Sequence, residues 1–348
     1  MYDINNILRE NIKNLTPYSS ARDEYQGEAS VFLDANENAF GSPLDTAYNR
    51  YPDPMQYQVK MRLSEIKGVP ARNIFVGNGS DEAIDILFRS FCNPGVDNVI
   101  IVPPTYGMYQ VSANINDVEV RKVLLTEEYQ LNLEGIAEAI DERTKLIFIC
   151  SPNNPTGNSI NRDDIETLLA NFNGIVVIDE AYINFSRQKT FIQELTEYAN
   201  LVVLQTLSKA WGLAGLRVGM AFASEEIIEV MNKVKPPYNV NEASQQLALE
   251  ALNNVQQVNE WIKETLAQRD KLVLTLKDFN FVLDIYPSDA NFILVKTTDA
   301  KGIYNFLVQN GIIIRNRTNV ELCEGCLRIT IGTPDENKIL IDTLQQYK

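Results

Sequence analysis

The sequence predicts an α/β protein with a mostly parallel sheet sandwiched by helices, followed by a smaller α+β domain at the C-terminal end. Runs at 145–150, 175–178 and 201–204, apolar apart from Lys145, alternate with helical patterns. Strands that are apolar on both faces are typical of parallel sheets covered by helices on each side. In the last hundred residues, four short strands alternate with two helices, which predicts the second domain.

The length of 348 residues favours two domains over one. We expect an N-terminal arm over 1–30, a large domain over 31–240, and a small domain with its linking helix over 241–348. Pro17 and the polar residues around it favour an extended arm over a helix. No apolar run approaches the length of a membrane span, and the N-terminus does not resemble a signal peptide. We therefore expect a soluble cytoplasmic protein.

The charge balance and the missing histidine exclude several classes of function. The chain has 31 basic and 46 acidic residues, for a net charge of −15, which argues against nucleic-acid and anionic-membrane partners. It contains no histidine, so histidine metal sites, Ser-His-Asp triads and histidine bases are excluded. Proton transfer near neutral pH must then use lysine, a carboxylate or tyrosine with a shifted pKa.

The four cysteines are interpreted as packing or loop residues. Cys323 and Cys326 form a C-x-x-C pair, whereas Cys92 and Cys150 stand alone. A zinc site would need a second pair or histidines, and the sequence offers neither. We therefore predict no metal site.

The first part of the predicted large domain contains short elements joined by turns. We expect a strand at 31–33, a turn at 34–38, a rigid turn at 51–54, a helix at about 57–66 and a strand at 73–79. Ser80 is the expected N-cap of the next helix, whose apolar residues recur at helical spacing. A glycine-bearing turn before a helix presents free N–H groups, which suits a phosphate.

Each strand of the predicted sheet is followed by residues suited to binding or chemistry. The strand at 98–102 leads to Tyr106, 145–150 to Asn154, 175–178 to Asp179 and Tyr182, and 201–204 to Lys209. Ligands bind beyond the carboxyl ends of parallel strands, so we expect these side chains to converge with the turn at Gly79. The remaining elements are a strand at 218–223, helices at 243–253 and 257–277, strands at 281–286, 292–296, 312–314 and 327–331, and helices at 300–309 and 336–346.

Lys209 is the candidate nucleophile. It follows an apolar strand and precedes Gly212 and Gly215, and Arg217 lies eight residues after it. Partial burial lets a lysine amine lose its proton and attack a carbonyl, and an arginine fork binds phosphate or carboxylate. The pattern indicates a Schiff base with an anionic aldehyde, for which pyridoxal phosphate is the candidate; a solvated loop lysine is the alternative.

Over nearly its full length, the chain resembles the fold-type I pyridoxal-phosphate-dependent aminotransferases. The motifs that carry the resemblance are Ser208-Lys209 with the glycines and Arg217 after it, Ser-Pro-Asn-Asn-Pro-Thr-Gly at 151–157, and Asp-Glu-Ala-Tyr at 179–182. Closer marks at 14–18, 33–38, 51–53, 311–317 and 326–332 are similar to those of the members that act on histidinol phosphate. The resemblance implies a seven-stranded large sheet and a transaminase of histidine biosynthesis.

The resemblance also implies roles for individual residues. Lys209 would hold the cofactor as a Schiff base and then move the proton between substrate and cofactor. Asp179 would face the ring nitrogen in an ion pair that keeps the carboxyl pKa low. Tyr182 and Asn154 would bond the phenolic oxygen, and Tyr106 would stack on the ring.

The cofactor phosphate is expected to bind at two strand ends. Its predicted ligands are Ser208, Arg217 and the N–H groups around Gly79, Ser80 and Asp81. Tyr51 would reach the same phosphate from the partner subunit of a homodimer.

One anion site is expected to serve both substrates. In the family, the arginine that matches Arg328 binds the carboxylate of glutamate or 2-oxoglutarate; here it would also take the phosphate of histidinol phosphate, with Arg315 and Tyr18. Asn36 completes the predicted substrate residues, and Arg317 is a further candidate. Arg328 alternates with apolar neighbours in its strand, so it faces either solvent or the interdomain cleft.

Three other functions fit part of the pattern. A decarboxylase of a phosphorylated amino acid such as threonine phosphate would release CO2 without 2-oxoglutarate. A broad or aromatic aminotransferase would accept phenylalanine. A non-catalytic regulator or scaffold would tolerate loss of Lys209, Asp179 or Tyr182, yet all three are present.

Overall fold

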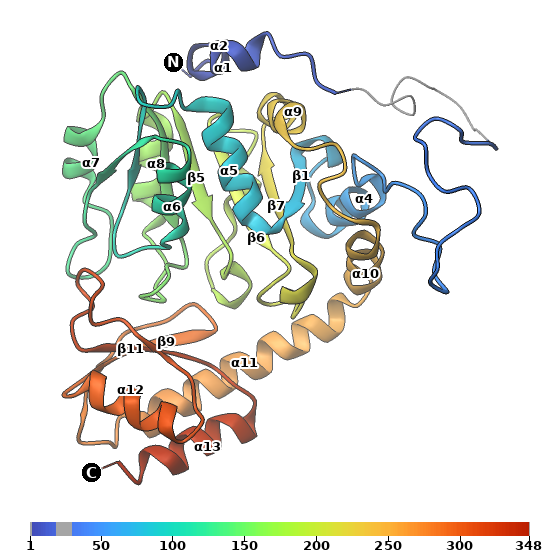
Figure 1. The fold of residues 1–348 in the computed structure, drawn as a ribbon. Coiled ribbons are helices and arrows are strands. Elements are labelled where there is room, and N and C mark those ends of the chain that lie inside the picture. Colours follow the sequence, from blue (N-terminus) through green and yellow to red (C-terminus); the bar gives the residue numbers. More distant parts are fainter. Residues whose placement is uncertain (1, 19–29, 348) are drawn as a thin grey trace.

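A seven-stranded sheet forms the centre of the computed structural model, which describes residues 2–18 and 30–347 (Figure 1). The strand order is β1-β7-β6-β5-β4-β2-β3. The strands are β1 Ile74–Asn78, β2 Asn98–Ile101, β3 Glu119–Lys122, β4 Thr144–Cys150, β5 Ile175–Asp179, β6 Leu201–Thr206 and β7 Val218–Ala223. Only β7 runs antiparallel to its neighbours, so the prediction of a mostly parallel sheet is confirmed.

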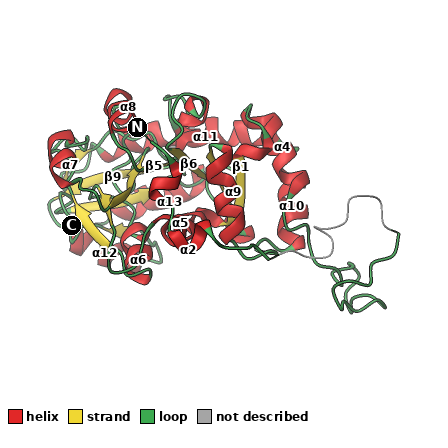
Figure 2. Ribbon diagram, turned by 90° about the horizontal axis from the view of Figure 1, so that it is seen from above, coloured by secondary structure: helices red, strands yellow, loops and turns green. Residues whose placement is uncertain are grey.

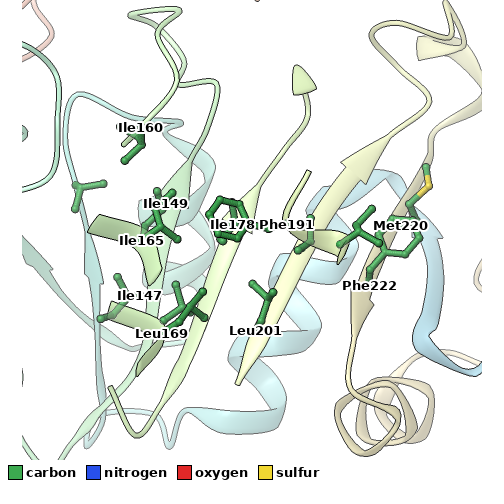
Figure 3. Close-up of a cluster of buried hydrophobic side chains, with 14 of the residues drawn as sticks. Ile147, Ile149, Ile160, Ile165, Leu169, Ile178, Phe191, Leu201, Met220 and Phe222 are labelled. Atoms are coloured by element: carbon green, nitrogen blue, oxygen red, sulfur yellow. The ribbon is translucent and has the colours of Figure 1, made fainter. Parts of the chain in front are cut away.

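Helices cover both faces of this sheet (Figure 1). One face packs against α5 Gly79–Phe91, α6 Met108–Ile115 and α9 Glu225–Val234. The other packs against α4 Tyr57–Lys67, α7 Leu133–Ala139, α8 Arg162–Asn171 and α10 Glu242–Leu252. Figure 3 shows Ile147 and Ile149 of β4 in one cluster with Ile165 and Leu169 of α8. Both faces of the central strands are therefore apolar because both are buried.

A four-stranded antiparallel sheet of order β10-β11-β9-β8 lies beyond one end of the large sheet (Figure 1). Its elements are β8 Val282–Ile285, β9 Phe292–Thr297, β10 Arg315–Asn316, β11 Cys326–Thr330, α12 Ala300–Gln309 and α13 Pro334–Leu344. The long helix α11, Val255–Leu276, runs from α10 to this sheet. Both sheets lie within the predicted large and small domains, whose boundaries stay a prediction.

Short 3-10 helices lie in connections: η1 Ala71–Asn73, η2 Ile183–Phe185, η3 Phe191–Glu194 and η4 Ala214–Leu216. Among residues 2–18 and 30–347, no helix has both the length and the apolar character needed to cross a membrane.

The N-terminal arm is helical at its start, which corrects the expectation of an extended chain. Helices α1 Ile4–Ile7 and α2 Glu10–Lys13 pack beside α5 and α9. Arg9 donates a hydrogen bond to the Arg89 carbonyl at 2.7 Å, and Ile4 and Ile7 are buried. Burial of these apolar side chains outweighs the polar composition of the segment. Residues 19–29 of the predicted arm lie outside the described residues.

Three local predictions were wrong. Residues 31–33 form no strand and are exposed within an irregular segment, 30–56, whose first part extends away from the body (Figure 2). Helix α5 begins at Gly79, and its N-cap is Asn78, whose N–H donates to the Glu82 carboxylate at 2.5 Å. The strand expected at 312–314 lies instead at Arg315–Asn316, where the backbone pairs with β11.

Candidate active site

A cavity of about 610 Å³ lies between the carboxyl ends of the parallel strands and the edge of the small sheet. It brings together most of the residues that the sequence singled out. They are Gly79, Ser80, Asp81, Tyr106, Asn154, Asp179, Tyr182, Ser208, Lys209, Arg217, Arg315 and Arg328. The alternating βα connections account for this convergence, since parallel strands end at one edge.

Lys209 enters the cavity from the turn after β6. The Ser208 N–H donates to the Thr206 hydroxyl at 3.0 Å, and the Gly212 N–H donates to the Lys209 carbonyl at 3.1 Å, so the backbone on both sides is held. The amine Nζ lies 5.7 Å from the centre of the Tyr182 ring. Burial, reinforced by the charge of Arg328, lowers the pKa of Lys209 and favours the neutral, nucleophilic amine.

Asp179 ends β5 and is 3% exposed. Its Oδ2 accepts the Tyr109 hydroxyl at 2.8 Å, and its Oδ1 accepts the Ala181 N–H at 3.0 Å. Burial raises its pKa to about 6 despite these bonds. The sequence led us to expect a low pKa for Asp179, and the described chain alone does not produce one. Among the described residues, no lysine or arginine forms an ion pair with Asp179. A cation on a ligand would restore it.

The N-terminus of α5 and the turn after η4 form an anion-binding corner. The Gly79 N–H donates to the Arg217 carbonyl at 2.7 Å. The Arg217 guanidinium reaches the Ser208 hydroxyl and the Asp81 carboxylate, each at 3.4 Å. Gly219 packs so closely that a Cβ there would lie 2.1 Å from the Ser80 nitrogen. The N–H groups of the first turn of a helix have no partner within the helix. An anion in this corner would therefore meet both these N–H groups and the Arg217 guanidinium.

Tyr106 borders the same corner. Its hydroxyl donates to Asp81 at 3.1 Å, and its ring meets the Tyr109 ring edge-on. The Thr105 hydroxyl beside it is buried and has no hydrogen-bond partner among the described residues. A buried hydroxyl without a partner costs free energy unless a ligand satisfies it.

Three arginines in or next to the small sheet also line the cavity. Arg328 donates to the Asn154 side-chain oxygen, and its guanidinium carbon lies 5.2 Å from the centre of the Phe292 ring. Burial and the neighbouring Arg317 lower the pKa of Arg328 to about 10. The Arg317 Nε is buried and unpartnered within the described chain. The sequence left two orientations open for Arg328, and in the structure this side chain faces the cleft. Together with Arg315 and Arg317, it forms a cluster of cations that suits an anion.

Three predicted residues lie outside this cavity. Tyr51 and Asn36 line a second cavity of about 530 Å³, where the Tyr51 ring stacks on Tyr238 at 4.5 Å between centres. Tyr18 is 69% exposed and lines neither cavity. Roles for these residues in substrate or cofactor binding remain predictions.

Sequence reasoning missed Tyr109 and Thr105. Tyr109 lies in α6 and touches Asp179 across 70 residues of chain. Helical spacing could have placed Tyr109 on the buried face of α6, but not opposite a particular carboxylate. All four cysteines, Cys323 and Cys326 included, are free and buried, which fits the expected packing role.

Comparisons with known proteins agree with one another. The family model for aminotransferase class I and II matches residues 29–344. A histidinol-phosphate aminotransferase from Parabacteroides distasonis is 55% identical over 348 residues, which is 100% of both chains. The histidinol-phosphate aminotransferase from Sinorhizobium meliloti, solved in complex with pyridoxal-5′-phosphate, has a TM-score of 0.80 at 22% identity and covers 90% of each chain.

The fold alone does not separate reaction types. The L-threonine-O-3-phosphate decarboxylase from Porphyromonas gingivalis matches with a TM-score of 0.74 at 23% identity, over 86% of this chain and 91% of its own.

Proposed function

We propose that this chain, which belongs to the class I and II aminotransferase family, exchanges an amino group between L-histidinol phosphate and 2-oxoglutarate or glutamate. The observation that carries the proposal is the 55% identity, over the whole of both chains, to a relative named for that activity. The cavity supports it, because one lysine amine and four arginines line it together. An amine and a cation cluster suit substrates that carry both an amino group and an anion.

Pyridoxal 5′-phosphate is the cofactor that we propose for this site. The corner formed by Arg217, Ser208 and the start of α5 suits its phosphate, and the Asp179 carboxylate suits a ring cation. The unpartnered Thr105 hydroxyl and the flat Tyr106 ring complete the fit. When bound, the cofactor supplies an aldehyde that condenses with amines and a ring that accepts negative charge.

The chain's own residues supply attachment, proton transfer and electrostatics. Lys209 would hold the cofactor covalently and, once free, move a proton at the substrate Cα; its lowered pKa suits both tasks. Asp179 would hold a proton on the ring nitrogen. Tyr182, whose hydroxyl lies 3.4 Å from the Asn154 amide nitrogen, would donate with Asn154 to the ring oxygen.

The arginine cluster accounts for the use of one pocket by two substrates. Arg328 and Arg315 would bind the phosphate of histidinol phosphate in one half-reaction and a carboxylate of 2-oxoglutarate in the other. Arg317, whose Nε has no partner among the described residues, could donate a further hydrogen bond to the phosphate, which carries more charge than a carboxylate. Tyr18 and Asn36 would join this site only through movement or from a second chain, since neither lines the cavity.

We further propose a cytoplasmic homodimer in which Tyr51 reaches the partner's cofactor phosphate. The support is that Tyr51 lines a second cavity, separate from the one that Lys209 lines in the same chain. Nucleic acid and membranes are not proposed as partners, given the net charge of −15.

An amino-donor screen tests the function. Purified protein loaded with pyridoxal phosphate is given 2-oxoglutarate and a panel that contains histidinol phosphate, phenylalanine, aspartate and threonine phosphate, and glutamate is measured. Histidinol phosphate should give the highest kcat/KM. Preferred use of phenylalanine would replace the substrate assignment, and CO2 release from threonine phosphate without 2-oxoglutarate would replace the reaction type.

A further inference from the structure

Tyr109 lies beneath the cavity, behind the carboxylate of Asp179. Its side chain is fully buried and does not line the cavity, so it contacts no ligand directly. Its hydroxyl donates to Asp179 Oδ2 at 2.8 Å, while the Ala181 N–H donates to Oδ1 at 3.0 Å. The two oxygens of Asp179 are therefore held from separate elements, α6 and the turn after β5.

The Tyr109 ring is itself fixed by aromatic contacts. It stacks on Phe148 of β4 with ring centres 4.9 Å apart, and it meets Tyr106 edge-on at 5.6 Å. Phe148 in turn stacks on Phe88 of α5 at 5.3 Å. The hydroxyl therefore has little freedom to leave the carboxylate, as a positioning group requires.

The chemistry of this pair suits a carboxylate that must stay charged. A hydrogen bond to the ionised form of a buried acid lowers its pKa, and Tyr109 is the strongest of the groups that oppose the effect of burial on Asp179. Tyr109 also keeps its own proton, because burial and the Asp179 charge raise its pKa well above the ordinary value. The chain contains no histidine that could serve instead.

We propose that Tyr109 is a positioning residue whose hydroxyl orients the Asp179 carboxylate, and keeps it ionised, for a cationic ring nitrogen of the bound cofactor. This inference rests on the proposed function and extends it to a residue outside the cavity. A purely structural Tyr109 would need only its ring, since the ring makes all the aromatic contacts.

The test is the affinity for pyridoxal phosphate in a double-mutant cycle. Y109F keeps the ring and removes only the hydroxyl. Equilibrium dialysis of cofactor-free wild type, Y109F, D179N and Y109F/D179N gives four dissociation constants. Y109F should weaken binding about ten-fold or more, the size expected for a hydrogen bond to a charged group, and should have less than about a two-fold effect in the D179N background.

The matched control is Y129F. Tyr129 is also buried, at 5% exposure, and its hydroxyl donates to the Leu322 carbonyl at 2.9 Å, away from the cavity lining. Y129F should leave the dissociation constant unchanged in both backgrounds. Loaded Y109F should also show a lower kcat at a nearly unchanged KM for histidinol phosphate, because Asp179 would contact the cofactor and not the donor.

Two results would overturn the inference. If D179N weakens cofactor binding and Y109F does not, Tyr109 has only a packing role and the proposed function stands. If D179N itself leaves the cofactor affinity unchanged, the role proposed for Asp179 is lost, and that of Tyr109 with it. Should Y109F fail to fold, the lower-pKa analogue 3-fluorotyrosine at position 109 tests the same bond: as a stronger donor it should tighten cofactor binding, and unchanged or weaker binding would contradict the inference.

Discussion

Arg315 and Arg328 are direct register partners across the β10–β11 pair. Like charges that face each other across two strands destabilise a sheet, by roughly 0.2–1 kcal/mol. Their juxtaposition, with Arg317 two residues along, concentrates positive charge at the cavity in a chain whose net charge is −15. An anion bound between them would remove the repulsion.

Replacing Arg328 by alanine should raise KM for both histidinol phosphate and 2-oxoglutarate. Loss of a charge-assisted contact of about 1.5–3 kcal/mol corresponds to roughly 10–100-fold. Steady-state kinetics with each substrate in turn measures the change, and exposed Arg72 replaced by alanine is the control. An effect on one substrate alone would contradict a shared anion site.

Replacing Lys209 by alanine should abolish turnover, by at least about 10⁴-fold, because the variant loses both the attachment point and the proton-transfer group. The visible absorption of the covalently held cofactor should disappear, while circular dichroism stays that of the wild type. Lys263 on the exposed side of α11 provides the control. Transamination retained by the Lys209 variant would refute the assignment of the nucleophile.

The titration of Asp179 should appear in the stability of the cofactor-free protein. Its folded pKa of about 6 lies above the ordinary 3.8, so its contribution to stability is full below pH 3.8 and is lost as the pH rises towards 6. Asp179→Asn removes the titration. Between pH 4.5 and 8, the wild type should therefore lose about 2 kcal/mol of unfolding free energy relative to this variant. Urea titrations measure the difference, and equal pH profiles would show that the pKa is not raised.

Replacing Gly219 by alanine should destabilise the protein and weaken cofactor binding. The added Cβ would lie 2.1 Å from the Ser80 nitrogen and 2.2 Å from the Gly79 carbonyl carbon, so the start of α5 must shift. Such overpacking costs about 1–3 kcal/mol. Gly215→Ala is the matched control, because no atom lies within 4 Å of the corresponding Cβ. Thermal unfolding and cofactor titration should show a lower unfolding temperature and weaker cofactor binding for Gly219→Ala than for Gly215→Ala.

Complementation between variants tests the proposed dimer. If Tyr51 serves the partner's site, a mixed dimer of Lys209→Ala and Tyr51→Ala subunits contains one site with both lesions and one with neither. Unfolding and refolding the two impaired variants together should therefore restore activity, while refolding either alone should not. If a mixture that is shown to contain mixed dimers does not regain activity, Tyr51 does not serve the partner's site.

The sequence alone determined the large sheet, apart from the edge strand β3, and most of the cavity lining. Its apolar runs and helical spacing follow directly from burial on two faces, and β7 and α12 have the bounds expected for them, 218–223 and 300–309. Because parallel strands end at one edge, residues named only for following a strand, such as Asn154 and Lys209, lie together in the structure. These features depend on local pattern and on the general geometry of parallel sheets.

Only the tertiary structure decided which partners these residues have. The Tyr109–Asp179 bond, the unpartnered Arg317 Nε and the raised pKa of Asp179 depend on contacts between distant segments. The N-terminal helices formed against expectation because α5 and α9 provide a surface that buries their isoleucines. Periodicity in a sequence indicates which side of a helix or strand is buried. Contacts, desolvation and pKa values depend instead on which groups of distant segments the fold places against that side.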